Sequence, residues 1–434
     1  MLKKLFTVAA FLVCAASFAI DGRLMFTLAL NIEDQFAQIM PHRAPNVPHV
    51  DRIVRHQPVQ LVLALMNPAA DADGKVLVLV ESIRSISPSG KVKELVKAGS
   101  PAVALQGVKK NPGDLSGIML AHTGGTMILE DGDPLGKWRV VFTVRDKGDG
   151  STREFTAEIE LVETLPGTPD KPMTAEEMSR FMTDYYRKPD PAKIPAAFDA
   201  FIKWDGAGKR NYDPLMWLCG FAELYRMNPQ FRPALIKAAA GYSQMHKLYV
   251  ALILDKAGAK EAELKDADPE LKRLFARVKS SGDSPLAFKE ITHPAQLDAL
   301  WTMFLTTGKF EPIRRLVHEL RKRDGAMTID EAKKLGRQLT EAEVKKLMPS
   351  LIASAADWSL ASNAKQHELV AFYLEAMLAR KQYPDADAAV KLAAMLVNAG
   401  VLETAKTPDG KMILKPVLRP AGGRPKTPYA PLGN

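Results

Sequence analysis

The spacing of the hydrophobic residues changes once along this chain, and that change constrains the fold more than any other feature. From about residue 22 to residue 163, apolar residues alternate with polar ones, as at Trp138, Val140 and Phe142. Successive side chains point to opposite faces of a strand, so this alternation predicts β-strands with one buried face. After Thr174 the apolar residues recur at intervals of three and four, which is the spacing of one helix face.

The strand-like half predicts an antiparallel β-sandwich. Short polar breaks rich in Gly and Asp separate the apolar runs, among them DADG from Asp71 and DGDPLG from Asp131. Several short strands joined by polar turns are typical of a sandwich of two sheets. KVLVLV, from Lys75, is apolar on both faces and predicts a central strand.

The helical half predicts an all-α domain of helical hairpins with a solenoid-like stacking, although no clean repeat emerges. Three capping-box signatures, each a Thr followed three residues later by a Glu, mark helix starts at Thr174, Thr328 and Thr340. LMWLCGFAELY, from Leu215, is apolar nearly all round and predicts a helix at the centre of the domain. Its Cys219 is expected to be a buried core thiol.

The N-terminus predicts export from the cell. Lys3 and Lys4 precede an apolar stretch that is too short to span a bilayer, and Ser17-Phe18-Ala19 places small residues where a signal peptidase cuts. We therefore expect a signal peptide at 1–19 and a periplasmic or secreted mature protein that is not transmembrane. Val13 precedes Cys14 where a lipobox has a small residue, which disfavours lipidation.

The formal net charge of +9 does not indicate nucleic-acid binding once its location is considered. Lys3, Lys4 and six cations after Ala405 carry most of it, and removing these eight cations together with Asp409 leaves 51 cations and 49 anions. A nearly neutral body argues against binding to DNA or RNA. The Pro- and Gly-rich basic tail is suited to touch an anionic surface, and we expect it to be disordered or an extended strap.

The expected organisation follows from these features. It comprises a signal peptide (1–19), a β-sandwich (20–165), a linker (166–173), an all-helical domain (174–404) and a basic tail (405–434).

Two resemblances support this organisation. LEDGDPLGKWRVVFTVRD, ending at Asp146, resembles the closing hairpin of bacterial immunoglobulin-like domains: an acidic turn, a Gly, an aromatic residue and an alternating strand. LWTMFLTTGKF, from Leu300, and ADWSLASNAKQH, from Ala356, are similar to an uncharacterised helical family of exported bacterial proteins. The first resemblance implies an Ig-like sandwich without the Cys pair of antibody domains. Neither implies a catalytic residue.

One group of residues raises the question of a metal site. His42, His49, Asp51 and His56 lie in a Pro-rich run, and imidazole and carboxylate groups are the ligands that zinc takes. Their spacing matches no compact pair of ligands, so we interpret the run as a connector between the first two strands. The metal site, and with it a metal-dependent hydrolase, stays open as the alternative.

A second group lies in the helical half. Trp358, Ser362, Asn363 and His367 bring polar groups close to an aromatic ring near a helix junction, which makes them a possible interaction cluster. The alternative is a hydrogen-bonding cluster that fixes the junction.

No nucleophile elbow, Walker loop or dinucleotide-binding glycine pattern occurs, and we expect no cofactor. The sequence therefore favours a non-catalytic binding or scaffolding protein of the periplasm or cell surface. Its expected partner is a protein or another cell-envelope component.

Overall fold

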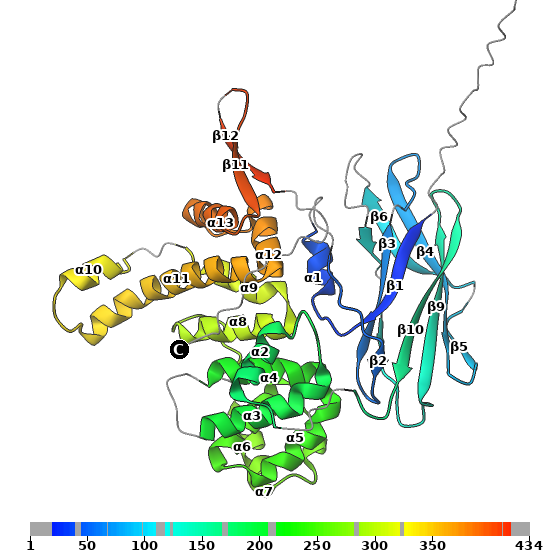
Figure 1. The fold of residues 1–434 in the computed structure, drawn as a ribbon, viewed down its shortest axis with the longest axis horizontal. Coiled ribbons are helices and arrows are strands. Elements are labelled where there is room, and N and C mark those ends of the chain that lie inside the picture. Colours follow the sequence, from blue (N-terminus) through cyan, green and yellow to red (C-terminus); the bar gives the residue numbers. More distant parts are fainter. Residues whose placement is uncertain are drawn as a thin grey trace, which may run out of the picture.

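The chain folds into strand-rich and helical parts that follow one another in the sequence. In the computed structural model the described residues are 20–39, 45–66, 68–97, 99–109, 118–121, 125–166, 172–206, 214–281, 286–321, 325–409 and 411–417. The strands from β1 to β10 gather on one side of the molecule and the helices on the other, with the short helix α1 (Ile32–Ala37) between them (Figure 1). The predicted α+β fold with separate strand and helical parts is confirmed at this level.

Two sheets form the strand domain. Its strands are β1 (Asp21–Thr27), β2 (Arg52–Ile53), β3 (Val59–Met66), β4 (Lys75–Ile86), β5 (Val92–Val96), β6 (Ala102–Lys109), β7 (Ile118–Leu120), β8 (Gly125–Met127), β9 (Gly136–Asp146) and β10 (Thr152–Leu161). One sheet has the order β1-β3-β7, with β8 also paired to β3. The other has the order β2-β10-β9-β4-β5, with β6 also paired to β4. The paired strands are antiparallel except for β2 and β10, which run parallel.

The two sheets enclose one hydrophobic core. Trp138, Val140 and Phe142 of β9 are buried in it, while Arg139 between them is exposed. The alternation read from the sequence is therefore confirmed for this strand. β4 pairs on one side with β9 and on the other with β5 and β6, which confirms its central position. The first strand ends at Thr27, although the apolar alternation continues as far as Leu30.

The helical region begins at α2. Its elements are α2 (Ala175–Asp184), η1 (Pro191–Lys193), α3 (Ile194–Gly206), α4 (Leu215–Met227), η2 (Pro229–Phe231), α5 (Arg232–Ala238), η3 (Ala239–Gly241), α6 (Gln244–Lys256), η4 (Glu261–Leu264), α7 (Pro269–Ser281), α8 (Ala295–Thr307), α9 (Phe310–His318), α10 (Ile329–Lys334), α11 (Glu341–Gln366), α12 (Glu368–Ala379) and α13 (Ala386–Asn398). No helix among the described residues is long and apolar enough to cross a membrane.

The predicted helix starts are confirmed. Thr174, Thr328 and Thr340 are the N-cap residues of α2, α10 and α11, and each forms a reciprocal capping box with the Glu three residues later. Each box satisfies backbone N–H groups that have no partner within the helix, which fixes where the helix begins.

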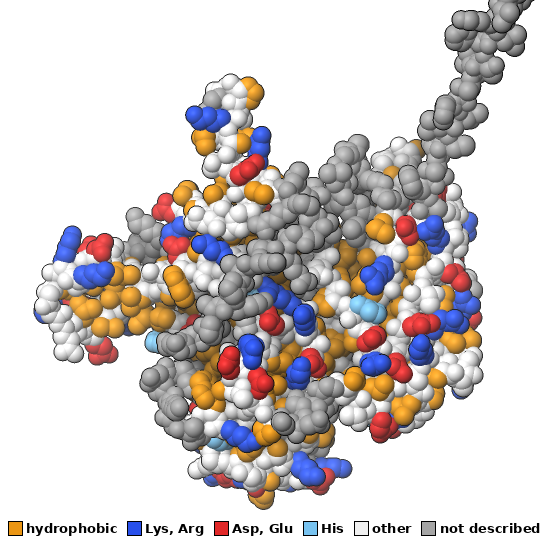
Figure 2. Space-filling view, in the orientation of Figure 1, with side chains coloured by type: hydrophobic (Ala, Val, Ile, Leu, Met, Phe, Trp, Pro, Cys, Tyr) orange, Lys and Arg blue, Asp and Glu red, His pale blue; other side chains and the backbone are white. Residues whose placement is uncertain are grey.

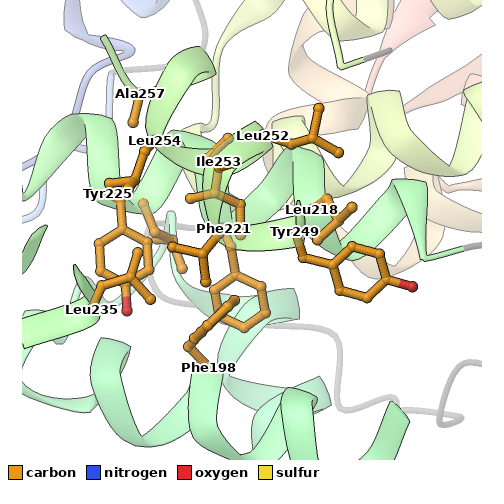
Figure 3. Close-up of a cluster of buried hydrophobic side chains, with 14 of the residues drawn as sticks. Phe198, Leu218, Phe221, Tyr225, Leu235, Tyr249, Leu252, Ile253, Leu254 and Ala257 are labelled. Carbon is orange, nitrogen blue, oxygen red and sulfur yellow. The ribbon is translucent and has the colours of Figure 1, made fainter. Parts of the chain in front are cut away.

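Helix α4 lies at the centre of the larger helical core, as predicted. It packs against α6 and α8, and Trp217 through Tyr225 are all buried. Phe221 and Tyr225 gather with Phe198 of α3 and with residues of α6 in one apolar cluster (Figure 3). Cys219 is a buried free thiol, which confirms the expectation of a core residue.

The region after α13 corrects one expectation. Instead of a disordered or extended tail, a two-stranded antiparallel hairpin begins there, made of β11 (Leu402–Lys406) and β12 (Met412–Pro416). It crosses the boundary that we placed at residue 405. Pro408 and Asp409 supply turn residues between two short runs of strand-forming residues, and the basic composition hid this local pattern. Residues 418–434 lie outside the described residues.

Helix α1 joins the strand domain to the helical region. The Asn31 side-chain amide donates to the carbonyl oxygen of Gly308 (3.0 Å), and the Asp34 carboxylate accepts from the backbone N–H of Phe310 (2.9 Å). Arg380, just after α12, donates to the carbonyl oxygens of Ala37 (2.6 Å) and residue 39 (3.1 Å). These contacts hold the two parts of the chain together.

Candidate functional site: a cleft between the two domains

A cleft of about 850 Å³ separates the strand domain from the helical region. This volume falls within the range of about 300–1,000 Å³ that is usual for ligand sites. Its strand-domain wall comprises Val54, Arg55, His56, Asp131, Glu163, Thr164 and Leu165. Its helical wall comprises Ala192, Pro195, Ala196, Pro229, Gln230, Phe231 and Pro233.

One ion pair and one His–Asp hydrogen bond line the wall of the strand domain. The Arg55 guanidinium lies 3.0 Å from the Glu163 carboxylate, and it also donates to the carbonyl oxygen of Asp133 (3.3 Å). The Nε2 atom of His56 lies 3.0 Å from the Asp131 carboxylate. These pairs join the segment after β2 to the turn before β9 and to the end of β10, so they fix the shape of this wall.

The backbone of His56 is unusual. Its φ angle is 60°, in the left-handed region that residues other than Gly rarely adopt. Its N–H donates to the carbonyl oxygen of Leu129 (2.8 Å), which holds the residue against the acidic turn. Strained backbone that persists beside a cleft is a feature of functional sites, and here it directs an imidazole to the mouth of the cleft.

The helical wall is apolar because helix starts meet there. Pro229 opens η2 directly after α4, Pro233 lies in the first turn of α5, and Pro195 lies near the start of α3. Proline is favoured in the first turn of a helix because the missing N–H would have no partner there. Phe231 lies between two of these prolines and adds the aromatic ring of this wall.

The exposed charge of the cleft is mainly acidic. The side chains of Asp131 and Glu163 are 86% and 73% exposed, whereas that of Arg55 is only 26% exposed. Each wall also holds one buried polar atom that has no hydrogen-bond partner in the described part of the chain. These atoms are Arg55 Nε on the strand-domain wall and Gln230 Oε1 on the helical wall.

The residues of the predicted metal site do not come together in the described structure. His56 lies in the cleft, whereas His49 lines a separate hollow beside Glu154 and Glu158 of β10. Asp51 is exposed, and its carbonyl oxygen accepts from the N–H of Glu160. Among the described residues no group of three or more His, Cys, Asp or Glu is placed to hold a metal ion. His42 lies outside the described residues.

The second predicted cluster is divided between two environments. Trp358 is 73% exposed on α11, and the Ser362 hydroxyl accepts from the side chain of Gln366. The Asn363 amide donates to the carbonyl oxygen of Ser359, one turn back in the same helix. His367 is buried between α11 and α12. Only Trp358 of this group faces solvent to a large extent.

His367 belongs to the junction of three helices. Its Nδ1 atom lies 3.1 Å from the hydroxyl of Tyr186, which follows α2, and Arg187 donates to both that hydroxyl and the carbonyl oxygen of Gln366. Burial lowers the pKa of His367 to about 3, and the nearby charge of Arg187 acts in the same direction. The arrangement is that of a group fixing a junction.

Sequence reasoning missed most of the cleft. Asp131 was considered only as part of a turn, and Glu163 was not considered. The closely spaced prolines around Phe231, in NPQFRP, were the one local signal of an apolar wall.

Known proteins provide no family for this chain. No protein-family model matches it, and no curated protein is significantly similar to it. Among solved structures, a family 123 glycoside hydrolase from Clostridium perfringens, described as acting on glycolipid glycans, is similar over 38% of this chain at 9% identity and a TM-score of 0.20. The matched region spans 32% of that enzyme's chain. A similarity this low carries no argument about fold or function.

Proposed function

We propose that this protein is a non-catalytic binding or scaffolding protein of the periplasm or cell surface, and that the cleft holds an extended segment of a protein partner. The cleft carries the proposal, because it combines a charged wall from one domain with an apolar wall from the other. A small number of placed polar groups on an apolar surface is the usual composition of a binding site.

The composition of the walls favours a polypeptide with basic and apolar side chains. The exposed carboxylates of Asp131 and Glu163 attract cations, and Pro229 and Phe231 offer contact area to apolar groups. β2, the edge strand of its sheet, leads directly into the cleft residues Val54–His56. Sheet edges bind extended peptides through backbone hydrogen bonds, which favours a polypeptide over a compact small molecule.

Three further predictions from the sequence belong to the same proposal, namely the Ig-like sandwich, the solenoid-like helical region and the signal peptide. We propose that the two-sheet domain is an Ig-like sandwich and that the helical region is a solenoid-like array of hairpins. Residues 1–19 serve as a cleaved signal peptide in this proposal. Both architectures commonly present binding surfaces, and export would place them in the cell envelope.

Photo-crosslinking in cells tests the proposal. Replacing Phe231 with p-benzoylphenylalanine puts a reactive group in the cleft of the full chain, expressed with its own leader in a Gram-negative bacterium. We expect one discrete adduct with an envelope protein, and we expect Asp131→Lys to reduce its yield by reversing the charge at the mouth.

The matched control carries the same group at Val92, an exposed residue of β5 outside the cleft. Equal adducts from both positions, or no adduct from position 231, would contradict the proposal. So would an adduct whose yield Asp131→Lys leaves unchanged.

A further inference from the structure

The hairpin of β11 and β12 projects from the helical region (Figure 1). Among the described residues its two strands pair only with each other. Leu402, at its root, is buried in the smaller helical core, which accounts for the attachment of the hairpin. Its tip stands above the rest of the molecule in the space-filling view (Figure 2). Two-stranded hairpins are at best marginally stable alone in water, so a contact that covers this one would stabilise it.

One face of the hairpin exposes two large apolar side chains. Residues that lie directly opposite each other in an antiparallel pair share a face of the sheet. Thr404 lies opposite Leu414 and Lys406 lies opposite Met412, so these four side chains lie on the same face. Met412 is 59% exposed and Leu414 is 42% exposed. We call this the apolar face of the hairpin.

The charge on the apolar face is positive. Lys406 is exposed, and it forms no ion pair with another described residue. The face holds no Asp or Glu, because Glu403 lies on the other face, where it is opposite Lys415. The apolar face therefore presents a cation that nothing on the same face neutralises.

The turn and the sequence after the hairpin do not reverse this charge. The Asp409 carboxylate, in the turn, lies 3.2 Å from the Nζ atom of Lys411. After Val417 the sequence contains three cations, Arg419, Arg424 and Lys426, and no Asp or Glu. The hairpin and the sequence that follows it are thus suited to an anionic surface.

An anionic lipid surface fits these features better than a folded protein. Each strand has five residues, and the exposed apolar area is that of two side chains. A stable protein interface buries about 1,200–2,000 Å² in total, which is far more. A peripheral membrane contact needs less, because a few apolar side chains enter the headgroup region while Lys and Arg attract anionic headgroups.

We propose that the apolar face of the β11–β12 hairpin binds the surface of a bilayer that contains anionic phospholipid. Met412 and Leu414 enter the headgroup region, and Lys406 lies beside the lipid phosphates. The site is separate from the interdomain cleft and does not depend on the function proposed for that cleft.

Sedimentation with lipid vesicles tests the proposal. The chain is used without residues 1–19, because their apolar stretch would bind lipid by itself. We expect it to sediment with vesicles that contain phosphatidylglycerol and to stay in the supernatant with phosphatidylcholine alone. Binding should weaken as the NaCl concentration rises, because salt screens the attraction between Lys or Arg and the lipid phosphates.

The apolar contribution is tested by Met412→Ser combined with Leu414→Ser. Both side chains are exposed, so folding should be unaffected, and we expect vesicle binding to weaken by more than about tenfold. The matched control is Val92→Ser combined with Leu95→Ser, which changes two apolar residues of β5 that are 53% and 51% exposed. The control should bind as the wild type does.

The charge on the apolar face is tested by Lys406→Glu. We expect this variant to bind phosphatidylglycerol vesicles much more weakly than the wild type. Lys93→Glu, at an exposed position of β5, changes the net charge by the same amount and should have far less effect.

The proposal is wrong if the chain stays in the supernatant with both kinds of vesicle, or if it sediments equally with both. It is also wrong if Met412→Ser with Leu414→Ser leaves binding unchanged, because the basic sequence after Val417 would then bind lipid without the hairpin. Equal losses from Lys406→Glu and Lys93→Glu would overturn it too, since binding would then follow net charge alone.

Discussion

At the scale of single residues, His367 couples the stability of the helical region to pH. Its side chain is almost fully buried, and burial lowers its pKa to about 3. In the unfolded chain an imidazole titrates near 6.5, so between these values the unfolded chain binds a proton that the folded chain excludes. The stability contributed by the neutral imidazole is therefore complete above pH 6.5 and is lost as the pH falls toward 3.

This lowered pKa predicts a measurable loss of stability in mild acid. Between pH 7 and pH 5 the free energy of unfolding should fall by on the order of 2 kcal/mol from this residue. Urea titrations at the two pH values measure the effect. His367→Gln should remove most of this pH dependence, whereas His293→Gln, at an exposed position, should leave it in place. If both variants kept the wild-type pH dependence, His367 would not be its source.

At the scale of elements, α4 and α8 approach each other closely because Gly220 has no side chain. A Cβ atom at this position would lie 2.4 Å from Thr302 Cγ2 and 2.6 Å from Met182 Cε. Real Cβ atoms do not come so close to other heavy atoms, so the side chains of Thr302 and Met182, or the helices that carry them, would have to move. Gly220 thus explains how an apolar helix packs at the centre of the core.

Gly220→Ala tests this packing. The change favours an isolated helix by up to about 1 kcal/mol, but overpacking a core usually costs about 1–3 kcal/mol. We expect a lower free energy of unfolding and a lower Tm in thermal denaturation. Gly241→Ala is the control, because a Cβ there meets no atom within 4 Å. A Gly220→Ala variant at least as stable as the wild type would contradict the close approach.

The elements predicted from the sequence are those whose signal is local. A capping box such as Thr340 with Glu343 lies within one helical turn, and the alternation around Phe142 lies within one strand. The cleft has no such signal, because the His56–Asp131 pair joins residues that lie 75 positions apart. Such pairs depend on how the elements pack, which the local pattern does not encode.

At the scale of the whole molecule, the strand domain and the helical region are joined by side chains that cap helix ends across their contact. The Asp34 carboxylate of α1 accepts from the N–H of Phe310, the first residue of α9, whose N-cap residue makes no side-chain hydrogen bond. Arg380, at the end of α12, donates to carbonyl oxygens at the C-terminal end of α1. The N-terminus of α9 is thus capped from α1, and the C-terminus of α1 is capped from the end of α12, with each charge suited to the helix dipole that it faces.

The charges of Asp34 and Arg380 contribute differently to the docking of α1. Burial raises the pKa of Asp34, although the hydrogen bond from Phe310 opposes that shift. The ionised carboxylate is therefore disfavoured by docking, and protonation in mild acid should not release α1. Asp34→Asn keeps an acceptor oxygen without the charge, so it should leave the domains docked.

Arg380→Ala should undock the strand domain from the helical region. The change removes three hydrogen bonds to the C-terminal end of α1 and leaves carbonyl oxygens there without partners. We expect faster amide hydrogen exchange in α1 and a larger radius of gyration in small-angle X-ray scattering. Arg273→Ala, which breaks an exposed ion pair with Glu270 within α7, should change neither quantity. The contrary result is that Arg380→Ala matches the wild type in hydrogen exchange and radius of gyration while Asp34→Asn increases both. In that case the docking of α1 would depend on the Asp34 carboxylate and not on the Arg380 guanidinium.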